Sequence, residues 1–248
     1  HPARGLFMHP RNKNLAIGSL IEALLYDAQR ERSTRFELLR WLEEVADHCT
    51  ICHKCLKPCP VDIDTGEVSI LERQILSGWG YKRTRGATEK TLGYLDSRSP
   101  AYNALFRASV VRLGGAAQRA GCAVVKPFQP ADRPSDFYPL QLLRAPVPRV
   151  PAETLRDVLP ACEADQVLVL EPEGEAAATV FYFPGCGSER LHSTVSMAAL
   201  HVLLATGTRV VLPPPFLCCG FPAKVNAKEE MYSRQVLRDT ILFSQIRE

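Results

Sequence analysis

The sequence predicts an α+β protein, with a helical N-terminal part and a C-terminal α/β part built around a small parallel sheet. Three observations predict this class. Residues 14–119 contain apolar residues that recur at the spacing of amphipathic helices. Residues 166–212 instead contain short apolar runs typical of strands, with a helical pattern between two of them. Eight prolines between residues 126 and 160 separate the two patterns, as in an extended connector.

The N-terminal part is expected to form helices over residues 14–31, 34–47, 66–77, 87–96 and 100–119. The candidate N-caps are Asn12 or Asn14 for the first helix, Asp64 or Thr65 for the third, and Ser99 for the fifth. Pro100 suits the first position of that fifth helix, whereas Gly114 and Gly115 are expected to weaken or end it.

The C-terminal part is expected to contain strands at 166–170, 179–183 and 209–212, and helices at 190–206 and from 226 to the end. The last two strands and the helix between them form a β-α-β unit, which favours parallel strands. The expected domains are a helical domain (1–122), a linker (123–165) and an α/β domain (166–248).

The composition excludes several classes of function. The chain has 248 residues and a net charge of +3, which is too small to indicate a nucleic-acid partner. No apolar run is long enough for a transmembrane helix, and there is no signal peptide. The nine cysteines cluster by spacing and do not form a dispersed disulfide framework, so a reducing, cytoplasmic compartment is expected. The chain lacks an initiator Met and stops within a helical pattern, so we expect an excerpt of a longer protein.

Four cysteines, Cys49, Cys52, Cys55 and Cys59, lie in one short loop and are followed by Pro60. Three of them recur at every third residue, which is the bacterial ferredoxin-type spacing for a [4Fe–4S] cluster. A structural zinc site usually needs two well-separated Cys-x-x-Cys pairs, although a zinc-stabilised, non-enzymatic scaffold is an alternative. We therefore expect these four thiols to bind iron–sulfur clusters.

A second group of cysteines follows the strands of the β-α-β unit. Cys186 follows the strand 179–183, and the adjacent Cys218 and Cys219 follow the strand 209–212. The carboxyl ends of parallel neighbours meet at one edge of a sheet, so these three thiols are expected to converge there as cluster ligands. Cys122 and Cys162 stand alone, and their default interpretation is structural.

Pro184-Gly185-Cys186, together with Cys218-Cys219-Gly220, resembles the first part of the cysteine-rich CCG domain. That domain occurs in heterodisulfide reductases and in the iron–sulfur subunits of glycolate, D-lactate and anaerobic glycerol-3-phosphate dehydrogenases. The segments 10–13 and 48–64 are similar to bacterial proteins that fuse an FAD-linked oxidase domain to such a region.

The resemblance implies an oxidoreductase region that passes electrons from flavin, through [4Fe–4S] clusters, to an acceptor such as a quinone. FAD would bind to an oxidase domain or subunit outside this chain, because no Gly-x-Gly-x-x-Gly follows a strand here. The implied location is the cytoplasm, compatible with peripheral contact with the inner face of the cell membrane. No catalytic residue is assigned.

Two departures from the family pattern concern the cluster ligands. Only one ferredoxin motif is present, and no cysteine follows Cys219. By resemblance, Cys49, Cys52 and Cys55 bind one cluster whose fourth ligand lies in the absent motif, and Cys59 serves the cluster of that motif. An alternative function, implied by the heterodisulfide reductases, is thiol–disulfide chemistry at Cys218 or Cys219.

Overall fold

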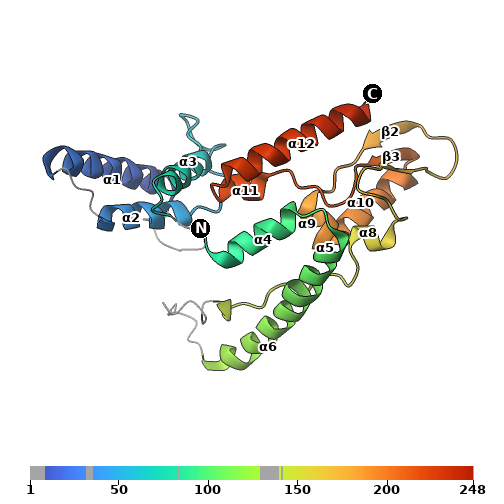
Figure 1. The fold of residues 1–248 in the computed structure, drawn as a ribbon, viewed down its shortest axis with the longest axis horizontal. Helices are drawn as coiled ribbons and strands as arrows, with labels where there is room; N and C mark the ends of the chain where they lie inside the picture. The colour runs from blue at the N-terminus through green and yellow to red at the C-terminus, as the bar shows by residue number, and fades with distance from the viewer. Residues whose placement is uncertain (1–8, 32–35, 83, 129–139, 141, 248) are drawn as a thin grey trace. The chain divides into compact units, whose positions relative to one another are not determined.

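The computed structural model describes residues 9–31, 36–82, 84–128, 140 and 142–247 (Figure 1). They form helices and one three-stranded sheet, so the predicted α+β class is confirmed. The chain divides into two compact units, with residues 1–89 and 220–236 in unit 1 and residues 90–219 and 237–248 in unit 2. The three domains expected from the sequence group the residues differently, and that division stays a prediction.

Unit 1 contains α1 (Pro10–Glu31), α2 (Phe36–Asp47), α3 (Thr65–Gly78) and α11 (Phe221–Val225), with the starts of α4 (Gly86–Asp96) and α12 (Glu229–Arg247). The expected cap of α3 is confirmed, because the Asp64 side chain accepts a hydrogen bond of 2.8 Å from the Gly66 N–H. Neither asparagine proposed for α1 lies at its start. The helix begins earlier, at Pro10, which suits a first turn, and Asn14 donates to the Thr65 hydroxyl at 3.3 Å.

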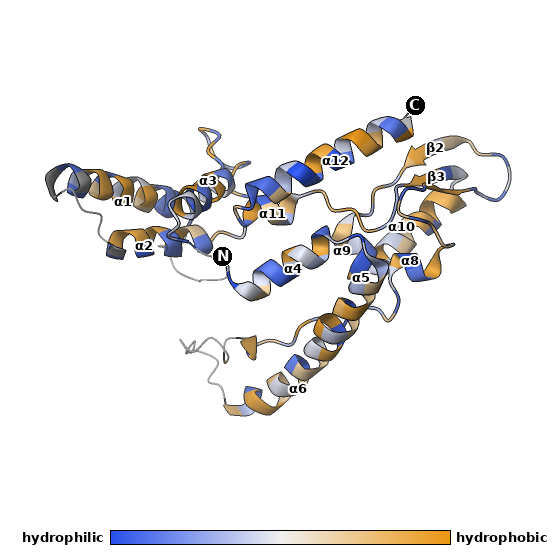
Figure 2. Cartoon of the chain, viewed as in Figure 1, coloured by the Kyte–Doolittle hydropathy of each residue, from blue (hydrophilic) through white to orange (hydrophobic). Residues whose placement is uncertain are grey.

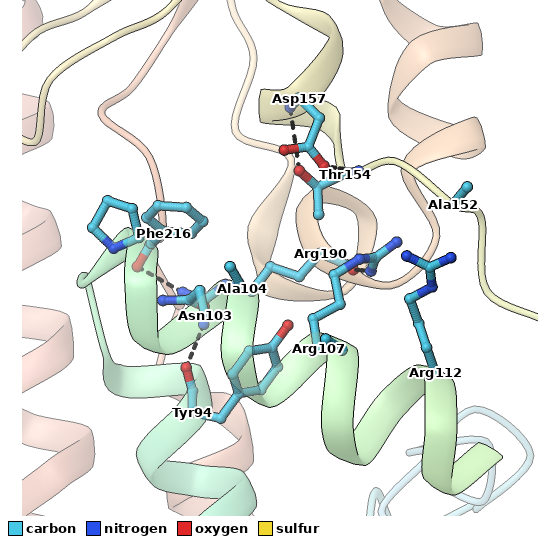
Figure 3. Close-up of a pocket in the computed structure, with 12 residues that line it drawn as sticks. Tyr94, Asn103, Ala104, Arg107, Arg112, Ala152, Thr154, Asp157, Arg190 and Phe216 are labelled. Atoms are coloured by element: carbon cyan, nitrogen blue, oxygen red, sulfur yellow. Dashed lines mark hydrogen bonds between the residues drawn. The ribbon is translucent and has the colours of Figure 1, made fainter. Parts of the chain in front are cut away.

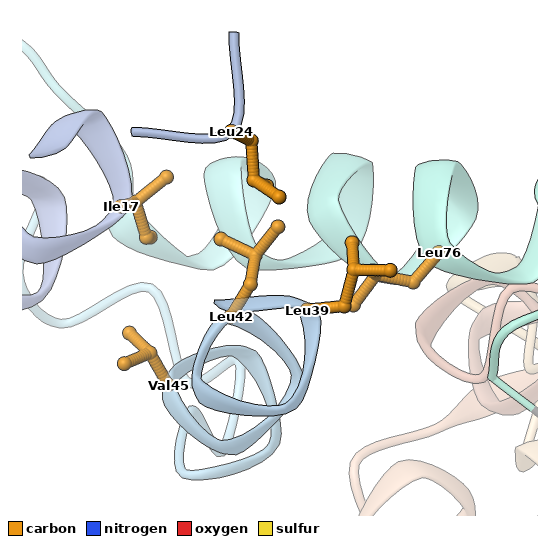
Figure 4. Packing of buried hydrophobic residues seen from close by; sticks show 6 residues of the cluster. All are labelled: Ile17, Leu24, Leu39, Leu42, Val45 and Leu76. Carbon is orange, nitrogen blue, oxygen red and sulfur yellow. The ribbon is translucent and has the colours of Figure 1, made fainter. Parts of the chain in front are cut away.

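Three helices enclose the hydrophobic core of unit 1. Figure 2 shows hydrophobic and hydrophilic residues alternating along α1, as expected for a helix with one buried face. The buried side chains come from α1, α2 and α3 and are Ile17, Leu24, Leu39, Leu42, Val45 and Leu76 (Figure 4). Since α2 and α3 precede and follow the cysteine loop, this core fixes both ends of that loop.

Replacing Leu76 with alanine is expected to lower the free energy of unfolding by about 2–5 kcal/mol, because it leaves a cavity in this core. Leu76 is 0% exposed, whereas Leu71 on the same helix is 57% exposed. The matched Leu71→Ala variant should therefore change stability by only about 0.5 kcal/mol. Urea denaturation of both variants checks the prediction, and equal losses would contradict the packing described for α3.

Unit 2 contains a long helical rod made of α5 (Pro100–Phe106), the π-helix η2 (Arg107–Gly114), α6 (Gly115–Val125) and the 3₁₀ turn η3 (Lys126–Phe128). The expected start is confirmed, since the Ser99 hydroxyl accepts from the Tyr102 N–H and Pro100 is the first helical residue. Gly114 and Gly115 do not end the helix, but the π-helical segment stops between them.

The sheet of unit 2 has the order β1-β3-β2. Strand β2 (Ala178–Phe181) pairs with β3 (Thr208–Leu212) in parallel, as the β-α-β pattern predicted. Strand β1 (Leu168–Leu170) pairs with β3 in the antiparallel direction, so the expected parallel sheet is a mixed one. The β1–β2 connection spans only residues 171–177, which is too short for the crossover that joins parallel strands.

The helical segment between β2 and β3 is divided in two. Helix α9 (Gly185–Arg190) follows β2 directly, and α10 (Ser193–Ala205) packs against the sheet. The sequence predicted one helix starting at 190 and missed α9. The core of this unit consists of Leu155 from the short α8 (Leu155–Val158), Leu200 from α10, and Val210 and Leu212 from β3. Among the described residues, no helix is long and apolar enough to cross a membrane.

Candidate functional site

Two of the three cysteines predicted at the strand ends meet in unit 2. Cys186 lies in the first turn of α9, just after β2, and Cys218 lies in the loop after β3. Their sulfur atoms are 3.6 Å apart, with the Cys218 thiol donating to Cys186. Cys218 is 1% exposed, whereas the Cys219 side chain is exposed. The predicted convergence is thus confirmed for Cys186 and Cys218, and their role as ligands stays a prediction.

The surroundings of Cys186 favour its thiolate form. The hydrogen bond from Cys218 lowers the pKa of Cys186, and the positive charge of Arg190 acts in the same direction. Burial and the neighbouring Cys219 oppose this shift but do not cancel it. A thiolate is the form of cysteine that binds metals and acts as a nucleophile. The surroundings of Cys186 therefore suit metal binding and nucleophilic attack equally.

A buried charged network holds the two cysteine segments together. The Glu189 carboxylate accepts from Arg156 at 2.6 Å and from the Phe216 N–H at 3.0 Å. The Arg190 guanidinium donates to the carbonyl of Phe216 at 2.8 Å and to that of Tyr94, and lies over both aromatic rings. Because Phe216 lies two residues before Cys218, these contacts fix the loop that carries Cys218 relative to α9.

Two glycines beside the cysteines have the left-handed backbone that disfavours other residues. Gly185 has a φ of 66° and Gly220 a φ of 83°. A β-carbon on Gly220 would also lie 2.8 Å from the ring of Tyr232. The glycine of the Cys-Cys-Gly sequence is therefore needed both for its backbone angle and for the space it leaves.

The cysteine loop of unit 1 is attached to the helices on either side of it. Arg73 on α3 donates to the carbonyl of Ala46 at 2.9 Å and to that of Cys49 at 2.8 Å. His53 contacts the carboxylate of Asp64 at 2.5 Å, next to the start of α3. In addition, the Ile63 N–H donates to the Cys59 sulfur at 3.3 Å. These bonds hold a loop that has no regular secondary structure.

Buried charged side chains surround this loop. Lys13 is buried, and desolvation lowers its pKa, although the nearby Cys49 and Cys55 partly offset this effect. Glu72 is buried too, and desolvation raises its pKa to about 8. A cavity of about 660 Å³ opens beside Cys55 and Cys59, between the loop and the first turns of α1.

The donors in unit 1 suit an iron–sulfur cluster. The four thiols lie within one loop, and hydrogen bonds from the Lys54 N–H and the Thr50 side chain lower the pKa of Cys52. Hydrogen bonds to sulfur and nearby charge are among the factors that set cluster potentials. Across the described ranges, no group of three or more His, Cys, Asp or Glu is arranged so that it could hold a metal ion. The residue types of the loop therefore suit a cluster, and its presence stays a prediction from the cysteine spacing.

Several residues of these sites were not found from the sequence. No recognisable sequence motif includes Glu189, Arg190 or Arg156. Glu72 lies within an ordinary pattern of helical residues. Lys13 lies in the segment Pro10–Lys13, which the sequence analysis had singled out, although without a role for this side chain. Cys122 is buried, as expected for a structural thiol, and Cys162 donates to the Gln166 carbonyl at 3.0 Å.

Comparison with protein families gives one match. The model of the cysteine-rich (CCG) domain matches residues 180–242, which include Cys186, Cys218 and Cys219. No curated protein and no solved structure matches the chain. This domain is associated with redox enzymes, which supports an oxidoreductase-like role in coarse terms. Residues 180–242 are therefore similar to the CCG cysteine-rich domain, and within them Cys186 and Cys218 are in sulfur–sulfur contact.

Proposed function

We propose that this chain is the electron-transfer region of an FAD-linked dehydrogenase that oxidises a 2-hydroxy acid such as glycolate or D-lactate. The observation that carries the proposal is the contact between Cys186 and Cys218 at the ends of two parallel strands. The cysteine loop of unit 1 adds a second group of thiols with ferredoxin-type spacing. Electrons would enter from flavin on another domain or subunit and leave to an acceptor such as a quinone.

In this proposal Cys49, Cys52 and Cys55 hold one [4Fe–4S] cluster, Cys59 serves a neighbouring one, and Cys186, Cys218 and Cys219 hold the cluster of the CCG site. Such clusters supply one-electron oxidation and reduction. The chain supplies the ligands, the N–H donors to sulfur, and the positive charges of Lys13 and Arg190. The charge of Arg190 favours the thiolate form of Cys186, and both charges would raise the reduction potential of a nearby anionic cluster.

Anaerobic purification, followed by measurement of iron, sulfide, zinc and flavin per chain, tests this proposal. The whole chain should bind iron and sulfide and give the electron paramagnetic resonance signal of a reduced [4Fe–4S] cluster. A triple variant, Cys49→Ser/Cys52→Ser/Cys55→Ser, should lose the iron of one cluster. A double variant, Cys186→Ser/Cys218→Ser, should lose the iron of another cluster. The control Cys162→Ser should lose none.

Two outcomes of the same measurement would contradict the proposal. Zinc without iron or sulfide would instead support the non-enzymatic scaffold. One FAD bound per isolated chain would contradict the proposal that flavin binds to another domain or subunit.

The short sulfur–sulfur distance favours a second candidate, a dithiol–disulfide couple related to heterodisulfide reduction. Its two thiols, Cys186 and Cys218, would give two electrons and two protons to an external disulfide and form one S–S bond. Peptide mapping after treatment of the iron-free chain with glutathione disulfide would detect this bond. If the two thiols stayed reduced while Cys162 reacted, this candidate would be rejected.

A further inference from the structure

A cluster of arginines in unit 2 lies along the helical rod, and one of them, Arg190, also belongs to the surroundings of Cys186. Two adjoining cavities, of about 340 and 510 Å³, lie along the helical rod, and Arg112 lines both of them. The arginines that line them are Arg107, Arg112, Arg119, Arg149 and Arg190. Among the described residues, the only acidic side chain in either wall is Asp157. That carboxylate accepts the Thr154 N–H at 2.7 Å and is part of a helix cap.

Two of these arginines are deeply buried. Arg107 is 6% exposed and Arg190 1% exposed. Their guanidinium groups donate to backbone carbonyls: Arg107 to those of Pro151 and Arg190, and Arg190 to those of Tyr94 and Phe216. The Nε–H of Arg190 has no hydrogen-bond acceptor in the described structure. A buried cation is costly without a counter-charge, so an anion in the adjoining cavity would stabilise this arrangement.

The π-helical geometry of η2 brings two arginines to one face. Arg107 and Arg112 are five residues apart, and in an α-helix they would point about 140° away from each other. A π-helix has i→i+5 hydrogen bonds, so residues five apart lie nearly above one another. Figure 3 shows Arg107 and Arg112 extending side by side from the same face of the rod. π-helical segments are rare and often occur at functional sites.

The opposite wall is attached to the rod by side chains that include Arg107 and Gln118. Gln118 donates to the carbonyls of Leu142 at 2.6 Å and Ala145 at 2.9 Å, and accepts from the Val147 N–H at 3.0 Å. These bonds hold the segment that carries Arg149 beside the rod. Neither Arg112 nor Arg149 forms an ion pair with any described residue. Within the described part of the chain, their guanidinium groups therefore have no carboxylate as counter-charge.

We propose that these cavities form a binding site for a phosphate-bearing ligand with at least two anionic groups, such as a diphosphate. Five positive charges along two connected cavities suit an elongated polyanion better than a single carboxylate. The planar guanidinium group binds phosphate oxygens through two parallel hydrogen bonds. The site shares Arg190 with the surroundings of Cys186, but its existence does not depend on the proposed electron transfer.

Isothermal titration of the whole chain with pyrophosphate and with inorganic phosphate tests the site. Pyrophosphate should bind with one-to-one stoichiometry, more tightly than phosphate. Arg112→Gln and Arg149→Gln should each weaken binding roughly tenfold or more, because each removes charge-assisted hydrogen bonds. The control Arg209→Gln removes an arginine that lines neither cavity and should leave the affinity unchanged. Arg107→Lys keeps the charge but loses the forked geometry, so it should also weaken binding.

A second arm identifies the source of the phosphate. Co-sedimentation with cardiolipin vesicles, compared with phosphatidylcholine vesicles, tests whether the site binds a lipid headgroup that carries two phosphates. Binding to the anionic vesicles that depends on Arg112 and Arg149 would support the site with a lipid as its ligand. Failure of both pyrophosphate and anionic vesicles to bind, or an equal loss in Arg209→Gln, would overturn the proposal. The iron content of the same samples is measured separately, so this result is independent of the electron-transfer test.

Discussion

Replacing Glu189 with alanine is expected to lower the free energy of unfolding by about 3–5 kcal/mol, because it leaves a buried guanidinium without its counter-charge. Glu189 and Arg156 form an ion pair of 2.6 Å with side chains that are 3% and 9% exposed. The substitution also removes the acceptor of the Phe216 N–H. Urea denaturation measures the stability loss, and faster alkylation of Cys218 would report the loosened loop.

The exposed pair of Glu171 and Arg209 provides the control for this prediction. Arg209 Nε lies 2.8 Å from Glu171 Oε1, but the Glu171 side chain is 56% exposed and the Arg209 side chain 43% exposed. Glu171→Ala should therefore change stability by no more than about 1 kcal/mol. Replacing both Glu189 and Arg156 with leucine and methionine should restore much of the lost stability. A loss of less than 1 kcal/mol in Glu189→Ala would show that the network does not support the cysteine site.

Replacing Glu72 with glutamine is expected to stabilise the protein at pH 8 and to have little effect at pH 4.5. Glu72 is 4% exposed, and neither of its carboxylate oxygens has a hydrogen-bond partner within the described chain. Burial raises its pKa from 4.5 to about 8, an effect that Asp47 reinforces and Arg73, Lys13 and Lys82 oppose. The folded state therefore holds a proton that the unfolded state releases.

The sign of the pH dependence follows from this difference in bound protons. Stability contributed by protonated Glu72 is complete below the unfolded pKa and is lost as the pH rises toward 8, by at most about 1.4 kcal/mol per pH unit. Glu72→Gln should remove this slope, whereas Glu67→Gln, at an exposed ion pair on the same helix, should keep it. Denaturation midpoints between pH 5 and 8 measure the slope, and parallel curves for wild type and Glu72→Gln would contradict the prediction.

The sequence was sufficient to predict the convergence of Cys186 and Cys218. Strand runs have a recognisable composition, and a helix between two strands implies that they are parallel, so their carboxyl ends meet. Neither step requires knowledge of distant contacts. The helix starts at Asp64 and Ser99 were predicted for the same reason, because a cap depends on residues that are adjacent in the chain.

The direction of β1 and the helix boundaries near the cysteines were harder to predict. Strand β1 joins the far edge of β3, and a short apolar run carries no information about which edge it will choose. Helix α9 has only six residues, including two glycines, so it shows no helical periodicity. Arg190 was therefore assigned to the start of the next helix, although it ends α9 and its charge acts on Cys186.

The sequence by itself determined where the thiols lie along the chain, which of them follow strands, and that the protein combines a helical part with an α/β part. Only the tertiary structure decided which charges are buried and what compensates them. Glu189 meets Arg156, Glu72 remains without a hydrogen bond in the described chain, and Arg107 stands beside Arg112. The burial of a charged side chain and its choice of partner depend on contacts between segments that are far apart in the sequence. The position of Arg107 beside Arg112 depends on a local change in helix geometry. Neither dependence produces a periodic pattern in the sequence.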